Sequence, residues 1–190
     1  MACKINTPWH RYALIAELAR RLEDKSPQFG KTSLQKMIYL LQELGGIPAD
    51  YRFSLYTHGP FTAQLLGDLD LVEALGAVKV NYVTSGYGGY QISPDREFEP
   101  IRDKASEFLH ANKAAIERLV DEFGAFSAKD LELRSTIVFL DRNVKRSKKD
   151  LDRGNFIGLV KKVKPRFTED AIAEALEELE KKNYVDDRRA

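Results

Sequence analysis

Lys and Arg residues are concentrated between positions 142 and 166, where ten cations accompany only two carboxylates and leave a local charge of +8. The ten cationic residues are Arg142, Lys145, Arg146, Lys148, Lys149, Arg153, Lys161, Lys162, Lys164 and Arg166. Such a density predicts contact with phosphate groups, as in nucleic-acid binding. Two other interpretations stay open: a solvated charged loop that the acidic helix after it partly neutralises, or a site for an acidic protein partner.

Aromatic and acidic residues define a second candidate surface, which lies between positions 61 and 93. The helix expected from about Phe61 to Leu75 exposes carboxylates and contains no Lys or Arg, which disfavours contact with DNA phosphates. The hairpin expected after it carries tyrosines, a residue type enriched in protein interfaces. The candidate residues for binding a partner protein are Tyr82, Tyr87, Tyr90, Asp68 and Asp70. The alternatives are that the tyrosines only cover the edge of the sheet, or that they contact nucleic acid.

Residue types that commonly catalyse reactions or bind metal ions are scattered along the chain. His10, His58 and His110 lack the spacing of an HxxxH or HExxH metal motif. Cys3 is the single cysteine, which excludes an internal disulfide and a cysteine-based zinc site. The glycine-rich segments do not fit the GxxxxGK[ST] phosphate loop. We therefore expect no catalytic residue, no metal site and no cofactor, with a nuclease as the enzymatic alternative.

The composition is that of an ordinary folded protein. Of the 190 residues, 43% are hydrophobic and 31% are charged, which is enough apolar material for one large domain or two small ones. The net charge of +1 does not by itself predict a polyanionic partner. No apolar run reaches the length of a membrane span, and the N-terminus lacks the apolar core of a signal peptide. We expect a cytoplasmic protein without a membrane partner.

The spacing of apolar residues predicts the elements of the first half of the chain. The expected elements are helices over 8–23, 32–45 and 61–75, a strand over 51–56, and a hairpin formed by 77–83 and 90–93. Thr32 and Gln35 match a capping box at the start of the second helix, and Gly45-Gly46 is expected to end it. Two or more helices followed by a hairpin in this order are typical of a winged helix.

The second half of the chain is predicted to be helical. Helices are expected over 98–123, 131–140, 156–163 and 169–182, with a polar loop or linker over 141–154. Ser127 and Thr168 are the expected caps of two of these helices, and the sequence after the last helix resembles the first strand of a small wing. The predicted fold is mainly α with a small β-hairpin sheet (α+β): a winged-helix-type domain over 1–110, followed by a C-terminal helical module over 111–190 that resembles an abbreviated second winged helix.

Short motifs in the first half resemble those of YwgA-like bacterial and archaeal proteins, which resemble in turn the Panacea (SocA-like) antitoxin domain. Family members show G-K/R-T-x-L-Q-K-x-x-Y, then an aromatic strand, then Y-G-P opening a helix with a D-L pair. The matching residues here are Gly30, Lys31, Thr32, Leu34, Gln35, Lys36, Tyr39, Tyr51, Phe53, Gly59, Pro60, Asp68 and Leu69. His58 departs from the aromatic residue that is more common before Gly-Pro. The resemblance covers roughly 8–110 well and 128–186 more loosely, and it implies a winged-helix-like scaffold with a non-enzymatic role.

These observations predict regulatory binding without catalysis, in one of two forms. In the first, the protein takes part in DNA-linked regulation: the segment 142–166 binds phosphates, and the N-terminal scaffold presents that segment or forms a homodimer. In the second, the protein is an antitoxin- or defence-type module that binds a partner protein through the tyrosine hairpin and the acidic third helix. Lys31 and Lys36 also suit phosphate contact, although a surface helix end with two lysines is the more common meaning of that pattern.

Overall fold

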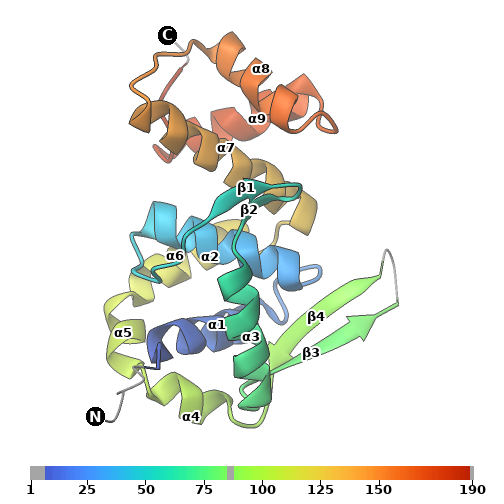
Figure 1. Ribbon diagram of the computed structural model, residues 1–190, viewed down its shortest axis with the longest axis vertical. Coiled ribbons are helices and arrows are strands. Elements are labelled where there is room, and N and C mark those ends of the chain that lie inside the picture. The colour runs from blue at the N-terminus through green and yellow to red at the C-terminus, as the bar shows by residue number, and fades with distance from the viewer. Residues whose placement is uncertain (1–6, 85–87, 189–190) are drawn as a thin grey trace, which may run out of the picture.

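The computed structural model describes residues 7–84 and 88–188 of the chain. Within these residues the fold is mainly α-helical, with two small antiparallel sheets of two strands each (Figure 1). The helices are α1 Trp9–Leu22, α2 Lys31–Gly45, α3 Ala63–Ala74, α4 Phe98–Asp103, α5 Ser106–Ala111, α6 Lys113–Phe123, α7 Ala128–Arg146, α8 Arg153–Val163 and α9 Glu169–Lys181. The strands are β1 Ser54–Tyr56, β2 Gly59–Phe61, β3 Val78–Val83 and β4 Gly89–Pro94. None of the helices in these ranges is long and apolar enough to cross a membrane.

The first two helices form the centre of the core because apolar residues cover most of their surface. Every residue of α1 from Tyr12 to Ala19 is buried, and α3, α4, α6 and β4 pack around this helix. The predicted apolar stripe of α2, from Leu34 to Leu41, is buried as well. Burial of each large apolar side chain contributes about 1.5–3 kcal/mol. Because α2 contacts α6, α7 and β2, it joins the two halves of the chain.

The start of α2 differs from the predicted capping box. Gly30 is the N-cap residue, and no side chain caps the helix. The Gln35 side chain binds the residue before α3 instead: its Nε2 donates to the Thr62 carbonyl (2.8 Å), and the Thr62 N–H donates to its Oε1 (3.1 Å). The capping-box prediction is therefore wrong, because a buried backbone segment uses both polar groups of this amide. Gly46 ends α2 with φ 64°, as predicted.

A short hairpin that the sequence analysis did not predict precedes α3. β1 pairs with β2 in antiparallel register, with Leu55 opposite Pro60, and the strand predicted over 51–56 is reduced to its last three residues. Gly59, with φ 89°, begins the second strand. β2 lies against α2 and α7. A larger residue at Gly59 would be strained by the positive φ angle and crowded by this packing, because a Cβ atom there would lie 3.1 Å from Thr136 Oγ1.

The β3–β4 hairpin forms as predicted and projects from the body of the molecule (Figure 1). Because side chains alternate along a strand, one face begins with buried Val78 and Ile92 near the body and continues outward to Tyr82 and Tyr90. Gly30 lets the strand β4 approach the start of α2, since a Cβ atom there would lie 2.4 Å from the carbonyl oxygen of Tyr90. Gly30 therefore has a packing role in its motif.

The helix α7 is longer than predicted. It continues through Arg146, so residues 141–146 are helical and the predicted loop begins later. Asp141 and Val144 explain the extension, because both are buried and the helix keeps them against the C-terminal elements. The segment predicted as helical over 98–123 forms three helices, α4, α5 and α6, rather than one.

Both predicted caps in the second half are confirmed. Ser127 caps α7 within a capping box, and the Thr168 side chain accepts a hydrogen bond from the third residue of α9. The strand predicted after α9 is absent from the described residues, so that prediction is wrong there. The chain instead returns to α7, where Arg188 Nη2 lies 2.8 Å from Asp141 Oδ1. A buried carboxylate that needs a cation fixes this tail in place of strand pairing.

Candidate functional site

Six of the ten cations between positions 142 and 166 are engaged within the fold. The six are Arg142, Lys145, Arg153, Lys161, Lys164 and Arg166. Buried Asp141 pairs with the first two, at 2.9 and 3.2 Å. Arg153 pairs with Glu180 of α9, and Lys161 Nζ donates to two backbone carbonyls of the turn before α9. These side chains therefore hold the C-terminal helices together.

A buried carboxylate of α7, Glu132, binds the last two of these cations. Its exposed fraction is 1%. Arg166 binds its Oε2, and Lys164 Nζ lies 3.0 Å from its Oε1 in an ion pair that lacks hydrogen-bond geometry. Lys164 also donates to the Thr57 carbonyl (2.5 Å), and His58 Nδ1 lies 3.3 Å from Glu132 Oε2. This cluster fastens the turn before α9 to the β1–β2 hairpin.

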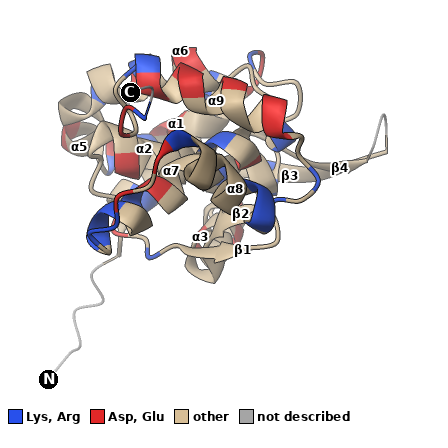
Figure 2. Cartoon of the chain, turned by 90° about the horizontal axis from the view of Figure 1, so that it is seen from above, with Lys and Arg blue, Asp and Glu red and all other residues tan. Residues whose placement is uncertain are grey.

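The other four cations of this segment remain on the surface. They are Arg146, Lys148, Lys149 and Lys162, all exposed and without an ion pair to any carboxylate that the structure describes. They lie at the end of α7, in the loop after it and on α8, while α9 carries a row of acidic residues (Figure 2). The charge available to a ligand is therefore smaller than the +8 of the sequence.

The tyrosines predicted to contact a partner protein lie on the projecting hairpin. Tyr82 and Tyr90 are 64% and 44% exposed, and their rings pack edge to face with centroids 5.5 Å apart. Tyr87 lies outside the described residues. The exposure leaves both described rings available for contact with a ligand or partner.

The two carboxylates predicted for the same surface differ in their exposure to solvent. Asp70 is exposed on α3, whereas Asp68 is buried. Tyr51 Oη donates to the Asp68 carboxylate (2.6 Å), and Arg11 lies 3.9 Å from it. The expectation that Asp68 faces the solvent is wrong, because a buried phenol needs an acceptor. Burial and this hydrogen bond also raise the pKa of Tyr51 above its ordinary value.

Three adjoining hollows around the first turns of α2 and α7 form one groove between the two hairpins. The largest, about 960 Å³ in volume, lies between the two helix starts and β4. Two smaller ones, of about 230 and 220 Å³, extend it toward the β1–β2 hairpin. Thr32 lines all three, so the hollows adjoin one another. We call this the cationic groove and define it by Lys31, Thr32, His58, Lys129 and Arg166.

Charged side chains and helix dipoles make this groove positive. Lys31, Lys129 and Arg166 line it, and Glu132 is the single carboxylate among its described lining residues. That carboxylate is already paired with two cations. The first turns of α2 and α7 line the same hollow, so the positive ends of two helix dipoles meet there. Because no side chain caps α2, its first backbone N–H groups are available to an anion.

Beneath the groove lies Lys36, which is only 2% exposed. Its Nζ donates to the Pro60 carbonyl (2.8 Å) and so anchors β2 to α2. Burial lowers the pKa of Lys36 to about 8, with Glu132 opposing this shift and Lys164 adding to it. The expectation of a surface lysine at this position is wrong, since the buried ammonium group donates a hydrogen bond to the β1–β2 hairpin.

Aromatic rings flank the groove on both hairpins. Lys31 Nζ lies 4.4 Å from the centroid of the Tyr90 ring, within cation–π distance. On the other hairpin, Tyr56 and Phe61 line the groove with ring centroids 5.7 Å apart. The sequence singled out Lys31 through its motif, whereas nothing around Lys129 distinguishes it from an ordinary surface lysine. Only the packing of α7 against α2 places both lysines along one hollow.

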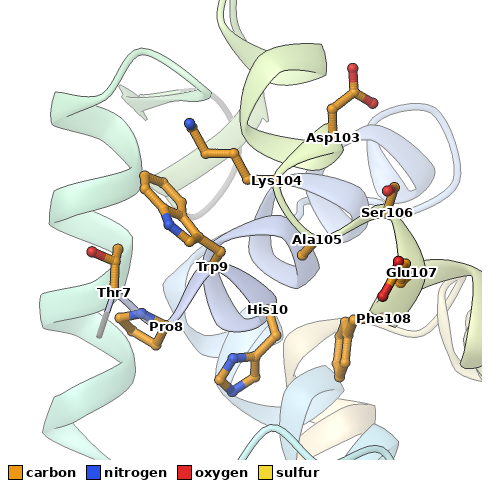
Figure 3. A pocket seen from close by; sticks show the side chains of 10 residues that line it. All are labelled: Thr7, Pro8, Trp9, His10, Asp103, Lys104, Ala105, Ser106, Glu107 and Phe108. Carbon is orange, nitrogen blue, oxygen red and sulfur yellow. The ribbon is translucent and has the colours of Figure 1, made fainter. Parts of the chain in front are cut away.

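A separate hollow of about 550 Å³ lies where the start of α1 meets α4 and α5 (Figure 3). Lys104 Nζ lies 4.7 Å from the centroid of the Trp9 ring, and the rings of His10 and Phe108 are 5.5 Å apart. Burial, with a smaller effect of Arg11, lowers the pKa of His10. Two carboxylates also line this hollow, so its charge is mixed. No group of His, Cys, Asp and Glu suited to hold a metal ion occurs within the described ranges.

Comparison with known proteins gives one informative result. No family model and no solved structure matches the chain. The chain is similar to the protein named "Uncharacterized protein YwgA" from Bacillus subtilis (strain 168), with 26% identity over 174 residues. The match covers 90% of this chain and 96% of that relative. The similarity extends through both halves of the fold and supports a relationship to YwgA-like proteins.

Proposed function

We propose that the chain is a non-enzymatic regulatory protein that binds nucleic acid in the cationic groove and acts in DNA-linked regulation. One observation carries this proposal: two helix N-termini meet beside Lys31 and Lys129, in a hollow whose single described carboxylate is already paired. Nucleic-acid affinity comes mainly from neutralising phosphates, so cations without competing carboxylates are the surface it requires. The rings of Tyr90 and Tyr56 add stacking surfaces for bases along the same groove.

The order of the elements supports a winged-helix-type scaffold for this function. α1, α2 and α3 precede the β3–β4 hairpin, with the β1–β2 hairpin inserted before α3. In this proposal β3–β4 acts as the wing, and nucleic acid lies against the outer part of this hairpin rather than along α3. The exposed carboxylate Asp70 on α3 and the absence of Lys and Arg from that helix favour this placement.

Fluorescence anisotropy with labelled duplex and single-stranded DNA tests the proposal at about 50 mM salt, where phosphate contacts are strong. The variant is the charge reversal Lys31→Glu with Lys129→Glu. Its matched control is Lys148→Glu with Lys149→Glu, which changes the net charge equally outside the groove. We expect the first pair to weaken binding at least tenfold, or about 1.4 kcal/mol, and the second pair to have a much smaller effect. Absence of binding to both forms of DNA, or equal losses in both variants, overturns the proposal.

A second candidate function is protein interaction through the β3–β4 hairpin, in keeping with the resemblance to antitoxin domains. The exposure of Tyr82 and Tyr90 on one face favours it, because exposed aromatic pairs are typical anchors of interfaces. The test is Tyr82→Ala with Tyr90→Ala, followed by binding of the purified partner identified from the native host. Tyr56→Ala, an exposed tyrosine on the other hairpin, is the control. Retained partner binding in the double variant contradicts this function.

A further inference from the structure

A second hollow, apart from the cationic groove, lies between α2, the segment before β1 and the C-terminal half of α7. Its volume is about 250 Å³, and Tyr39, Phe53 and Phe139 line it together with Asn143 and Arg146. Both sites touch α7, but Lys129 of the groove and Asn143 of this hollow are 14 residues apart on the helix, or about 21 Å along its axis at 1.5 Å per residue. We call this hollow the aromatic pocket. It is distinct from the proposed nucleic-acid site and does not depend on it.

Aromatic rings form the apolar part of this pocket. The rings of Tyr39 and Phe53 are 5.2 Å apart in an edge-to-face arrangement, and Phe139 lies 6.0 Å from Tyr39. Tyr39 is buried, while Phe53 and Phe139 are half-buried and so keep part of their surface open. Such rings favour a flat aromatic ligand, because offset or edge-to-face contacts add to the effect of apolar burial.

Donors and cations dominate the polar part of the pocket. Glu43 is the single carboxylate among the described lining residues, and Arg142 lies 3.7 Å from it. Arg142 also pairs with Asp141 and donates to the Tyr184 carbonyl, so few of its N–H groups are left to bind a ligand. Among the described residues, neither Arg146 nor the Asn143 side chain has a hydrogen bond or ion pair to another side chain.

We infer that the aromatic pocket binds a small aromatic carboxylate, with its ring against Phe53 and Phe139 and its carboxylate on Arg146 and Asn143. A guanidinium group is the side chain best suited to a carboxylate, since it presents parallel N–H donors. The volume lies just below the range usual for drug-sized ligands, which points to a ligand with one ring. Burial raises the pKa of the Tyr39 phenol, so this hydroxyl stays neutral and adds no charge that would repel the ligand.

Saturation-transfer NMR and calorimetry with the full chain test this inference. The probe is benzoate, with benzyl alcohol to supply the ring without the charge and acetate to supply the charge without the ring. We expect transfer from the protein to benzoate, weaker transfer to benzyl alcohol and none to acetate. No transfer to benzoate at millimolar concentration overturns the inference, as does equal binding of benzyl alcohol.

A pair of charge reversals locates the site. Arg146→Glu removes the guanidinium group that is proposed to bind the carboxylate of the ligand. The change breaks no ion pair that the structure describes, so the fold is expected to persist. Circular dichroism and thermal unfolding verify that it does. Lys149→Glu, three residues further along and outside the pocket, is the matched control. We expect benzoate affinity to fall at least tenfold in the first variant and to stay within twofold in the second. Phe139→Leu, which keeps an apolar side chain but removes a ring, is expected to weaken benzoate binding severalfold. Equal affinities in Arg146→Glu and the unchanged protein overturn the inference.

Discussion

The chain contains two cation-bearing regions, the segment 142–166 and the cationic groove, which share Arg166 but otherwise differ in the partners of their cations. In the segment, six of ten cations bind carboxylates or carbonyls of the fold, so the highest charge density in the sequence serves mainly to hold elements together. In the groove, Lys31 and Lys129 come from separate parts of the sequence and have no ion pair with a described carboxylate. A ligand responds to the charge that remains unpaired on the surface, which a count along the sequence does not give.

The largest expected effect tests whether the buried pairs of the segment are structural. Glu132→Gln leaves Lys164, itself 3% exposed, without its carboxylate. Breaking a buried pair by removing one partner costs about 3–5 kcal/mol, because the remaining charge stays buried. We expect the free energy of unfolding in urea to fall by about 3 kcal/mol. Glu174→Gln, at an exposed position of α9, is expected to change it by less than about 0.5 kcal/mol; similar values for both variants would contradict a structural role of the cluster.

The next effect concerns Lys36, which lies below the groove and is as buried as Lys164 of the segment. Its pKa is about 8 in the folded protein and 10.5 in a model peptide, so between these values the unfolded chain binds more protons than the folded one. The free energy of unfolding should therefore rise with pH through this window, by at most about 1.4 kcal/mol per pH unit.

Lys36→Met removes this titration and isolates it. We expect the stability of the unchanged protein relative to the variant to rise by about 1–2 kcal/mol from pH 8 to pH 9.5, as urea unfolding measures. The window ends at pH 9.5 because buried tyrosines with raised pKa values, Tyr39 and Tyr51, act in the opposite direction above pH 10. A difference between the two proteins that does not vary with pH would show that Lys36 is not titrating in this range.

A smaller effect distinguishes the groove from α3, the helix that contacts DNA in many winged helices. Tyr90→Leu removes a stacking ring at the edge of the groove, and base stacking contributes about 1–3 kcal/mol per base. We expect the affinity for single-stranded DNA to fall by about 1–2 kcal/mol, measured by anisotropy. Leu71→Ala, an exposed apolar position on α3, is the control and should leave the affinity unchanged. A larger loss in the control would move the contact surface to α3.

The last effect is a change in the salt dependence of DNA binding. If Lys31 and Lys129 each neutralise one phosphate, the double charge reversal should reduce the slope of log affinity against log salt by about 2 for duplex DNA. Charge reversal of the exposed pair Lys148 and Lys149 should leave this slope nearly unchanged. A reduced slope in the second variant and not in the first would place the phosphate contacts in the segment 142–166 after all.

Local patterns made many elements of the fold predictable. The apolar stripe of α2, the caps at Ser127 and Thr168 and the β3–β4 hairpin all follow from residues close in sequence, and all are confirmed. The prediction of a capping box at Thr32 is wrong because the Gln35 side chain hydrogen-bonds to the backbone of a residue 27 positions away. The prediction of a strand after α9 is wrong within the described residues because Arg188 pairs with Asp141, which is distant in the sequence. Each error arises where a distant polar group competes with the local pattern.

The site was predictable only in part, for the same reason. The motif that contains Lys31 and the exposure of Tyr82 and Tyr90 follow from the sequence. The burial of Asp68 and Lys36 does not, since each depends on one partner from another element, Tyr51 and Pro60 respectively. Lys129 carried no local signal, and its position in the groove depends on the packing of α7 on α2.

The sequence by itself determined most of the helical segments, the place of the exposed hairpin and the resemblance to YwgA-like proteins, because periodicity, caps and motifs are local properties. Only the tertiary structure decided which charges remain free. Desolvation forces buried carboxylates such as Glu132 and Asp141 to take the nearest cations, and those cations are then lost to any ligand. Lysines that packing places beside helix N-termini, away from carboxylates, keep their charge for a partner.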